Sequence, residues 1–204
     1  MKKFILCLLI LLVTVSSASA VTVTGMAVDI DPDHLVSRAV YVRLVSYDAD
    51  KGTVRMEIIT PEVFRADEIQ SLSVGDSIFT DGKEVLITSI SEEDGYIILN
   101  RENEESPDES VWLYESLDFN YHRADVNDDF WLTVATIDVP LPDSIVYVDA
   151  NNPTSELPAV YGREELISAV CAENGSELSR DNAIAFFNAA GDLVIIKRRY
   201  TPWG

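Results

Sequence analysis

Aromatic and polar side chains are concentrated between residues 112 and 131. This segment of 20 residues holds six of the 17 aromatic residues that follow Ala20, where an even distribution would place about two. Acidic, amide and basic side chains are interleaved with them. A flat ring covers the apolar C–H face of a sugar, and neighbouring polar groups hydrogen-bond to its hydroxyls. The segment therefore predicts a carbohydrate-binding surface, with these ligand-binding candidates: Trp112, Tyr114, Tyr121, His122 and Trp131.

The same residues also have a purely structural interpretation, and the sequence favours it. Trp112, Tyr114 and Trp131 fall on segments that we expect to be strands, where large aromatic rings commonly fill the core. The polar residues between them would then belong to a loop. The two interpretations differ in their consequences, because truncating a core ring costs stability and truncating an exposed ring does not.

A weak calcium site is predicted inside this segment. Asp125, Asn127 and Asp129 place oxygen ligands at alternate positions, as the start of a calcium loop does. The EF-hand pattern requires Gly at its sixth position and Glu at its twelfth, where this chain has Phe130 and Thr136. The expected site is therefore of the extracellular kind, with millimolar affinity and fewer ligands.

Histidine and cysteine offer little further chemistry. His34 follows alternating acidic residues from Asp29 to Asp33, which would suit a divalent metal but also form an exposed acidic turn around Pro32, and the turn is favoured. Cys171 lies at the end of a predicted amphipathic helix, and we expect it to be a buried small hydrophobe. The chain contains no nucleophile elbow, phosphate loop, dinucleotide fingerprint or zinc-protease helix, so the common enzyme classes are unsupported.

The N-terminus has the pattern of a secretory signal peptide over residues 1–20. Lys2 and Lys3 precede an apolar run of 12 residues, Phe4 to Val15, and small residues follow up to Ala20. We expect cleavage between Ala20 and Val21. The run is shorter than the roughly 20 residues that span a bilayer, so no transmembrane segment is predicted. The mature protein should then be secreted or extracytoplasmic.

The overall charge restricts the partners. The chain carries 35 acidic and 15 basic residues, a formal net charge of -20. Such a charge repels phosphate backbones, so we expect no nucleic acid partner. A carbohydrate or an envelope protein fits the charge and the predicted export better.

Alternating apolar residues predict a mainly β fold. Val54, Met56 and Ile58 alternate with polar neighbours in a hairpin over residues 40–59, and Asp81-Gly82 and Asp94-Gly95 mark further tight turns. Strands are also expected around residues 111–115, 131–137, 145–148, 183–187 and 193–200. A single helical turn is expected within residues 61–70, and one confident helix from about Arg163 to Glu173 with Gly162 as its N-cap.

The expected architecture is a small antiparallel barrel or a curled sheet built from hairpins, with one short helix near the C-terminus, and an α+β fold as the alternative. Residues 21–204 should form one domain. Alternatively, two subdomains, 21–101 and 111–204, are joined by an acidic loop around Pro107.

The function that these observations favour is that of an exported, non-catalytic protein that binds a ligand, such as a glycan, or a component of the envelope. The first alternative is a carboxylate-dependent glycan hydrolase, which needs two carboxyl groups facing each other across a cleft. The second is a structural or assembly role with a protein partner, through an exposed strand edge.

Overall fold

The computed structural model describes residues 20–101, 110–117, 120–125, 128–150, 157–172, 176–179 and 182–199. The signal peptide predicted before Ala20 and the acidic loop around Pro107 lie outside the described residues. The structure is 52% strand and 9% helix, which confirms a mainly β fold. The strands are β1 (Thr22–Thr24), β2 (Met26–Ala27), β3 (Ala39–Asp48), β4 (Thr53–Phe64), β5 (Ser77–Thr80), β6 (Lys83–Leu86), β7 (Ile90–Glu93), β8 (Tyr96–Leu99), β9 (Val111–Glu115), β10 (Tyr121–Asp125), β11 (Asp128–Asp129), β12 (Trp131–Pro140), β13 (Val146–Asp149), β14 (Ala159–Tyr161), β15 (Ala183–Phe187) and β16 (Leu193–Arg198); the helices are α1 (Ala66–Ser71) and α2 (Arg163–Val170).

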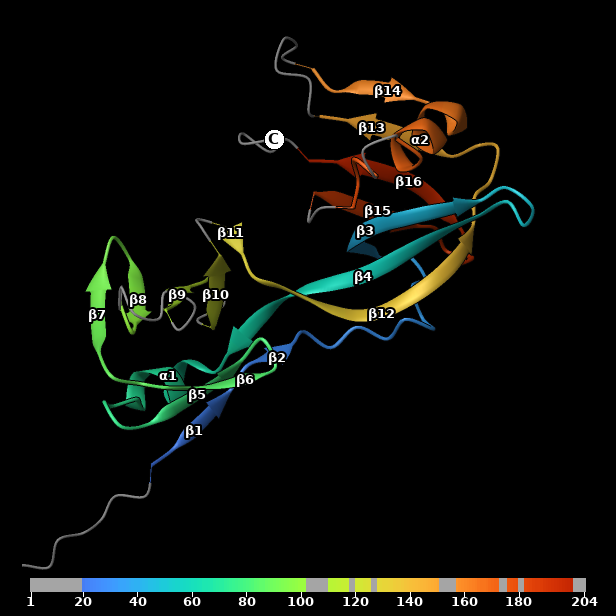
Figure 1. The fold of residues 1–204 in the computed structure, drawn as a ribbon. Helices are drawn as coiled ribbons and strands as arrows, with labels where there is room; N and C mark the ends of the chain where they lie inside the picture. Colours follow the sequence, from blue (N-terminus) through green and yellow to red (C-terminus); the bar gives the residue numbers. More distant parts are fainter. Residues whose placement is uncertain are drawn as a thin grey trace, which may run out of the picture.

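The strands form two sheets. The larger sheet follows the order β14-β13-β16-β15-β3-β4-β10-β9-β8-β7, with β2, β11 and β12 attached beside this path, and the smaller has the order β1-β5-β6. Figure 1 shows β4 and β12 running between an upper group, which contains β13–β16, and a lower group, which contains β7–β10. The pairs β1–β5 and β13–β16 are parallel, and the curled sheet does not close into a barrel. The barrel and the purely antiparallel pairing are therefore not formed.

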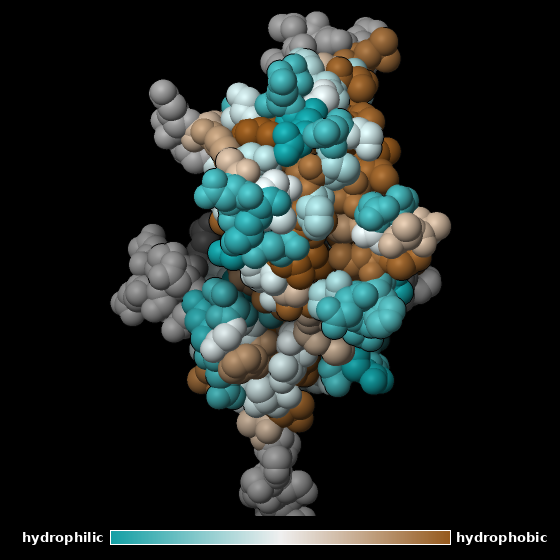
Figure 2. Space-filling view, turned by 90° about the vertical axis from the view of Figure 1, so that its right-hand side faces the viewer, coloured by the Kyte–Doolittle hydropathy of each residue, from teal (hydrophilic) through white to brown (hydrophobic). Residues whose placement is uncertain are grey.

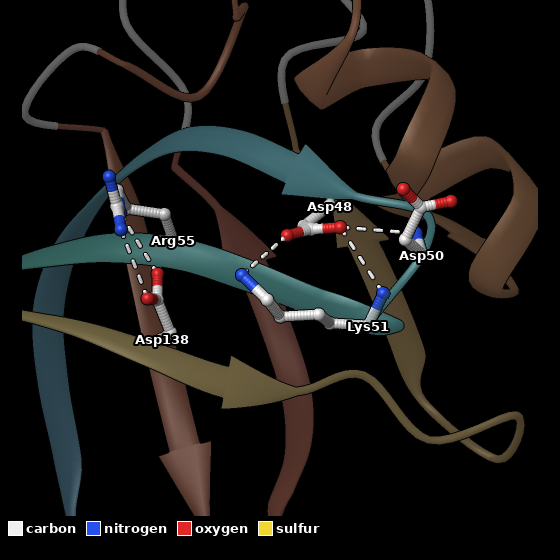
Figure 3. Close-up of polar contacts among 5 residues, drawn as sticks. All are labelled: Asp48, Asp50, Lys51, Arg55 and Asp138. Atoms are coloured by element: carbon white, nitrogen blue, oxygen red, sulfur yellow. Dashed lines mark hydrogen bonds and ion pairs between the residues drawn. The ribbon is translucent and has the colours of Figure 1, made fainter.

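Strand β4 is the axis of the fold because it pairs along both edges. Residues 53–59 pair with β3, residues 53–61 pair with β12, and the last residues pair with β10 and β2. The predicted alternation orients the strand: Val54, Met56 and Ile58 point into the core, and Arg55 points outward. On the outer face the guanidinium of Arg55 donates two hydrogen bonds to Asp138 of β12, at 2.9 and 3.0 Å (Figure 3).

The turn from β3 to β4 is held by a single carboxylate. The backbone N–H groups of Asp50 and Lys51 donate to Asp48 Oδ1 at 3.1 and 3.2 Å, and Lys51 Nζ lies 3.0 Å from the other oxygen (Figure 3). Gly52 completes the turn with a φ of 64°, which suits glycine. The hairpin predicted over residues 40–59 is therefore confirmed.

The core consists of two apolar clusters that meet on β4. The first cluster includes Val54, Met56 and Ile58 and extends through β3, β15, β16 and α2. The second includes Phe64 and extends through β1, β5, β8 and β9. Between these two parts of β4, Thr60 and Glu62 are each only 2% exposed. A buried polar layer therefore separates the two clusters.

The domain boundary predicted at the acidic loop remains a prediction. Strands β10 and β12, which follow that loop in the chain, both pair with β4, which precedes it.

Within the described residues, no helix is long and apolar enough to cross a membrane.

Both helices lie where the sequence places helical structure. Helix α1 extends the predicted single turn and buries Ile69. Helix α2 begins after Gly162 as predicted, and the Gly162 N–H donates to Glu165 Oε2 at 3.3 Å. It ends at Val170, three residues before the predicted Glu173.

The expectation that Cys171 is buried is wrong. The side chain is exposed, and the residue is the C-cap of α2, with its N–H donating to the Ile167 carbonyl at 2.9 Å. The helix buries Leu166 and Val170 instead. Successive helical residues are about 100° apart, so Cys171 points away from the direction in which Val170 packs.

Candidate functional site

Three of the five predicted ligand-binding residues lie on one face of the sheet. Tyr114 of β9 lies directly opposite His122 of β10 on one side and Tyr96 of β8 on the other, and Trp112, two residues before Tyr114, points to the same face. The ring of Tyr96 meets those of Tyr114 and Trp112 edge to face, with centroids 5.9 and 5.7 Å apart, and the rings of Tyr114 and His122 are 5.4 Å apart. We call these four side chains, Tyr96, Trp112, Tyr114 and His122, the aromatic row.

The aromatic row is partly open to solvent at one end. Trp112 is 36% exposed, and its indole N–H donates to Ser110 Oγ at 3.1 Å, which restrains the ring. Cross-strand aromatic contacts of this kind stabilise a sheet as well as offering ring surface to a ligand.

The other end of the aromatic row meets the carboxylate of Asp129 in β11. The Tyr114 hydroxyl donates to Asp129 Oδ1, and His122 Nδ1 lies 3.5 Å from the same oxygen. Partial burial works to raise the pKa of Asp129, but the hydrogen bonds from His122 and Tyr114 outweigh it, and the pKa is lowered overall. The row therefore ends at an ionised carboxylate, which is a fixed hydrogen-bond acceptor.

The structure places the other two predicted residues elsewhere. Tyr121 precedes His122 on β10, so its side chain points to the opposite face, where it is 8% exposed and belongs to the second core cluster. Trp131 is 6% exposed and packs against Tyr41, with ring centroids 4.7 Å apart. For both residues the burial agrees with the structural interpretation.

The predicted calcium ligands are described only in part. Asn127 and the side chain of Asp125 lie outside the described residues, and Asp129 is engaged by Tyr114 and His122. The described side chains include no group of three or more His, Cys, Asp or Glu residues placed to hold a metal ion. The calcium site therefore remains a prediction.

The acidic segment before His34 forms an exposed turn. His34 Nδ1 lies 2.6 Å from Asp31 Oδ2, and both side chains are more than half exposed. The pKa of Asp31 is lowered, first by the hydrogen bond from the Asp33 N–H and then by His34. This arrangement matches the turn interpretation of the sequence.

Glu62 is a buried acid that the sequence analysis did not single out. Its carboxylate accepts a hydrogen bond from the Thr80 hydroxyl, and Arg123 Nη1 lies 3.7 Å from Glu62 Oε2 and 2.9 Å from Thr80 Oγ1. The guanidinium also packs on the Phe130 ring, 3.9 Å from its centroid. Burial raises the pKa of Glu62, although Thr80 and Arg123 favour the charged form.

The signal that identifies Glu62 was available in the alternation of β4. The buried positions Val54, Met56 and Ile58 continue in steps of two to Thr60, Glu62 and Phe64. Extending the pattern past the apolar residues would have placed Glu62 inside. Gly25 packs against it so closely that an added Cβ would lie 2.5 Å from Glu62 Oε1.

Comparison with known proteins assigns the chain to no family. No family model, no curated protein and no solved structure matches the chain.

Proposed function

We propose that the protein is an exported, non-catalytic binding protein that holds a carbohydrate on the aromatic row. The observation that carries the proposal is the partly exposed Trp112 ring, set beside Tyr96 and Tyr114 in a row that ends at the Asp129 carboxylate. The ring would cover the C–H face of a sugar, and the carboxylate would accept hydrogen bonds from its hydroxyls.

The geometry supports binding better than glycoside hydrolysis. A hydrolase of this class needs a carboxyl group with a raised pKa within about 5 to 9 Å of a second carboxylate, across a cleft. The carboxyl group with a raised pKa in the described part of the chain is that of Glu62, which is 2% exposed and bound by Thr80. Asp129, at the aromatic row, has a lowered pKa and does not suit the role of an acid.

The assembly alternative has a strand edge to use. Strand β14 ends the order of the large sheet, and Val160 and Tyr161 on it are 68% and 43% exposed. Figure 2 shows that apolar residues also gather on the surface between polar ones. This alternative becomes the better account if the aromatic row binds no sugar.

Glycan binding by the purified protein tests the proposal. We expect Trp112→Ala to weaken the affinity for the bound glycan about tenfold, the effect of losing one aromatic ring that contacts the ligand. The melting temperature should change little, because the ring is already partly exposed. The matched control is Tyr161→Ala, which removes an exposed ring from β14 and should leave the affinity unchanged. Absence of binding to every glycan of an array would contradict the proposal.

Export has a separate test. The mass of the protein recovered outside the cytoplasm should correspond to a chain that begins at Val21, because Ala18 and Ala20 present small residues to a signal peptidase. A protein of full mass retained in the cytoplasm would contradict export without affecting the binding proposal.

A further inference from the structure

A groove lies beside the β7–β8 hairpin, with a volume of about 330 Å³. It is lined by Glu92, Glu93, Asp94, Gly95, Tyr96, Ile97, Glu115 and Tyr121. The turn at its rim is built by Asp94 and Gly95, which have φ values of 50° and 85°. The two residues form the tight hairpin turn that their sequence predicts.

The groove lies partly on the face of the sheet opposite Tyr114 and His122 of the aromatic row. Glu115 and Tyr121 are directly opposite each other on β9 and β10, and each is adjacent in the chain to a member of the aromatic row, Tyr114 or His122. Because successive strand residues point to opposite faces, Glu115 and Tyr121 lie on the face opposite Tyr114 and His122, whereas Tyr96 belongs to both the groove and the aromatic row.

The polar side chains of the groove are hydrogen-bond acceptors without a basic neighbour among the lining residues. Four carboxylates and two phenols line it. The described residues give Glu93 an ion pair with Arg101, whereas Glu92, Asp94 and Glu115 have no ion pair there. Three negative charges in the groove are therefore available to a ligand.

Tyr121 supports a ligand site in the groove independently of the carboxylates. The residue is only 8% exposed, and its side chain makes no hydrogen bond to the described residues. Its hydroxyl is not enclosed in the core, so it reaches solvent where the residue lines the groove. A phenol fixed by the core and left without a partner offers a positioned oxygen to a donor group.

The placement of the carboxylates distinguishes between kinds of cation. None of the described acidic groups converge as a set of three or more that could hold a metal ion. Separated carboxylates match a ligand whose positive charges are also separated along a chain. The volume of the groove falls at the lower end of the range for small-molecule sites.

We propose that this groove binds a small organic polycation, a linear polyamine with ammonium groups several bonds apart. The ammonium groups would pair with Glu92, Asp94 and Glu115, and one N–H would donate to the Tyr121 hydroxyl. The methylene segments between the charges would lie along Ile97 and the Tyr121 ring. The net charge of -20 would draw such a cation toward the protein.

Calorimetric titration of the purified protein with spermidine tests this site. At about 0.15 M salt the Debye length is about 8 Å, so charges distant from the groove contribute little. We expect one spermidine bound per chain, and affinity about threefold to fivefold weaker for Glu115→Gln, the scale of losing one exposed ion pair. Tyr121→Phe keeps the ring and should weaken binding by a similar factor.

The matched control is Glu164→Gln on α2, which makes the same chemical change at an exposed position outside the groove. It should leave spermidine affinity unchanged. Equal weakening by Glu164→Gln and Glu115→Gln would overturn the site in favour of nonspecific attraction. Absence of binding, or displacement of spermidine by an equal concentration of calcium, would also overturn it. If Tyr121→Phe lowers the melting temperature, Glu92→Gln replaces it, with the same expected loss of affinity.

Discussion

Replacing Trp131 with alanine is expected to lower the free energy of unfolding by about 3 to 5 kcal/mol, the usual cost of truncating a buried large aromatic side chain. The ring is 6% exposed, packs against Tyr41 and stands on β12 opposite Pro61 of β4. A cavity there would open at the junction of the two strands that connect both halves of the fold. Urea unfolding followed by circular dichroism measures the loss.

Trp112→Ala is the matched control, because it makes the same substitution on a ring that is 36% exposed. Its loss of stability should be much smaller. Trp131→Phe should also lower the stability less than Trp131→Ala does. The indole N–H is buried without a hydrogen-bond partner among the described residues, so phenylalanine loses part of the ring volume but no hydrogen bond. Equal stability of Trp131→Ala and the unmutated protein would contradict the core assignment.

Local patterns predicted the hairpins because each depends on a few adjacent residues. Alternation in β4 and the Asp-Gly turns after β5 and β7 specify the local geometry without help from the rest of the chain. The parallel pairing of β13 with β16 depends instead on segments far apart in sequence. No short-range pattern encodes such a pairing, so it could not be predicted from the sequence.

For the candidate site too, the sequence predicts local geometry but not which surface is buried. Alternation separates Tyr121 from His122 and Trp112 from Leu113 on β10 and β9, so the two faces could be told apart. Which face packs against the core depends on the small sheet and α1, which supply Val23, Ile78 and Ile69 to the second cluster. The sequence pattern alone therefore groups Tyr121 and Trp131 with residues that the structure places on a different surface.

Cys171 and Glu62 show two further limits of pattern-based prediction. Cys171 was expected to share a buried face of the helix with Ile167, but α2 buries Leu166 and Val170, and Cys171 is its exposed C-cap. Glu62 was overlooked because a single acid on a strand is ordinarily exposed. The cost of burying its carboxylate is offset by the hydrogen bond from Thr80 and the charge of Arg123, which come from distant parts of the chain.

Arg123→Met is expected to lower the free energy of unfolding by about 3 kcal/mol or more near pH 8, the usual cost of removing one partner of a buried ion pair. Methionine keeps much of the side-chain volume but leaves the Glu62 carboxylate without its cation. It also removes the hydrogen bond from Arg123 Nη1 to Thr80 Oγ1, at 2.9 Å. The control is Arg55→Met, which breaks the exposed pair with Asp138 and should change stability little.

The loss caused by Arg123→Met should depend on pH, because Glu62 can take up a proton. Its folded pKa already lies above the ordinary value of 4.5, so the folded state binds more protons than the unfolded state between those two pKa values. The free energy of unfolding therefore falls as pH rises through that interval, and protonation removes the penalty below it. Without Arg123 the folded pKa rises further, so the difference between mutant and wild type should be smaller at pH 5 than at pH 8.

Glu62→Gln isolates the contribution of the carboxylate, since glutamine keeps the shape and retains an acceptor for Thr80. Relative to wild type, it should be more stable near pH 8 than near pH 4.5, because the raised pKa means that the buried site disfavours the charge. The double variant Glu62→Gln with Arg123→Met should lack the pH dependence of Arg123→Met alone. Urea unfolding at the two pH values measures all three variants. A pH-independent loss in Arg123→Met would show that Arg123 stabilises the fold through Phe130 packing rather than through the Glu62 charge.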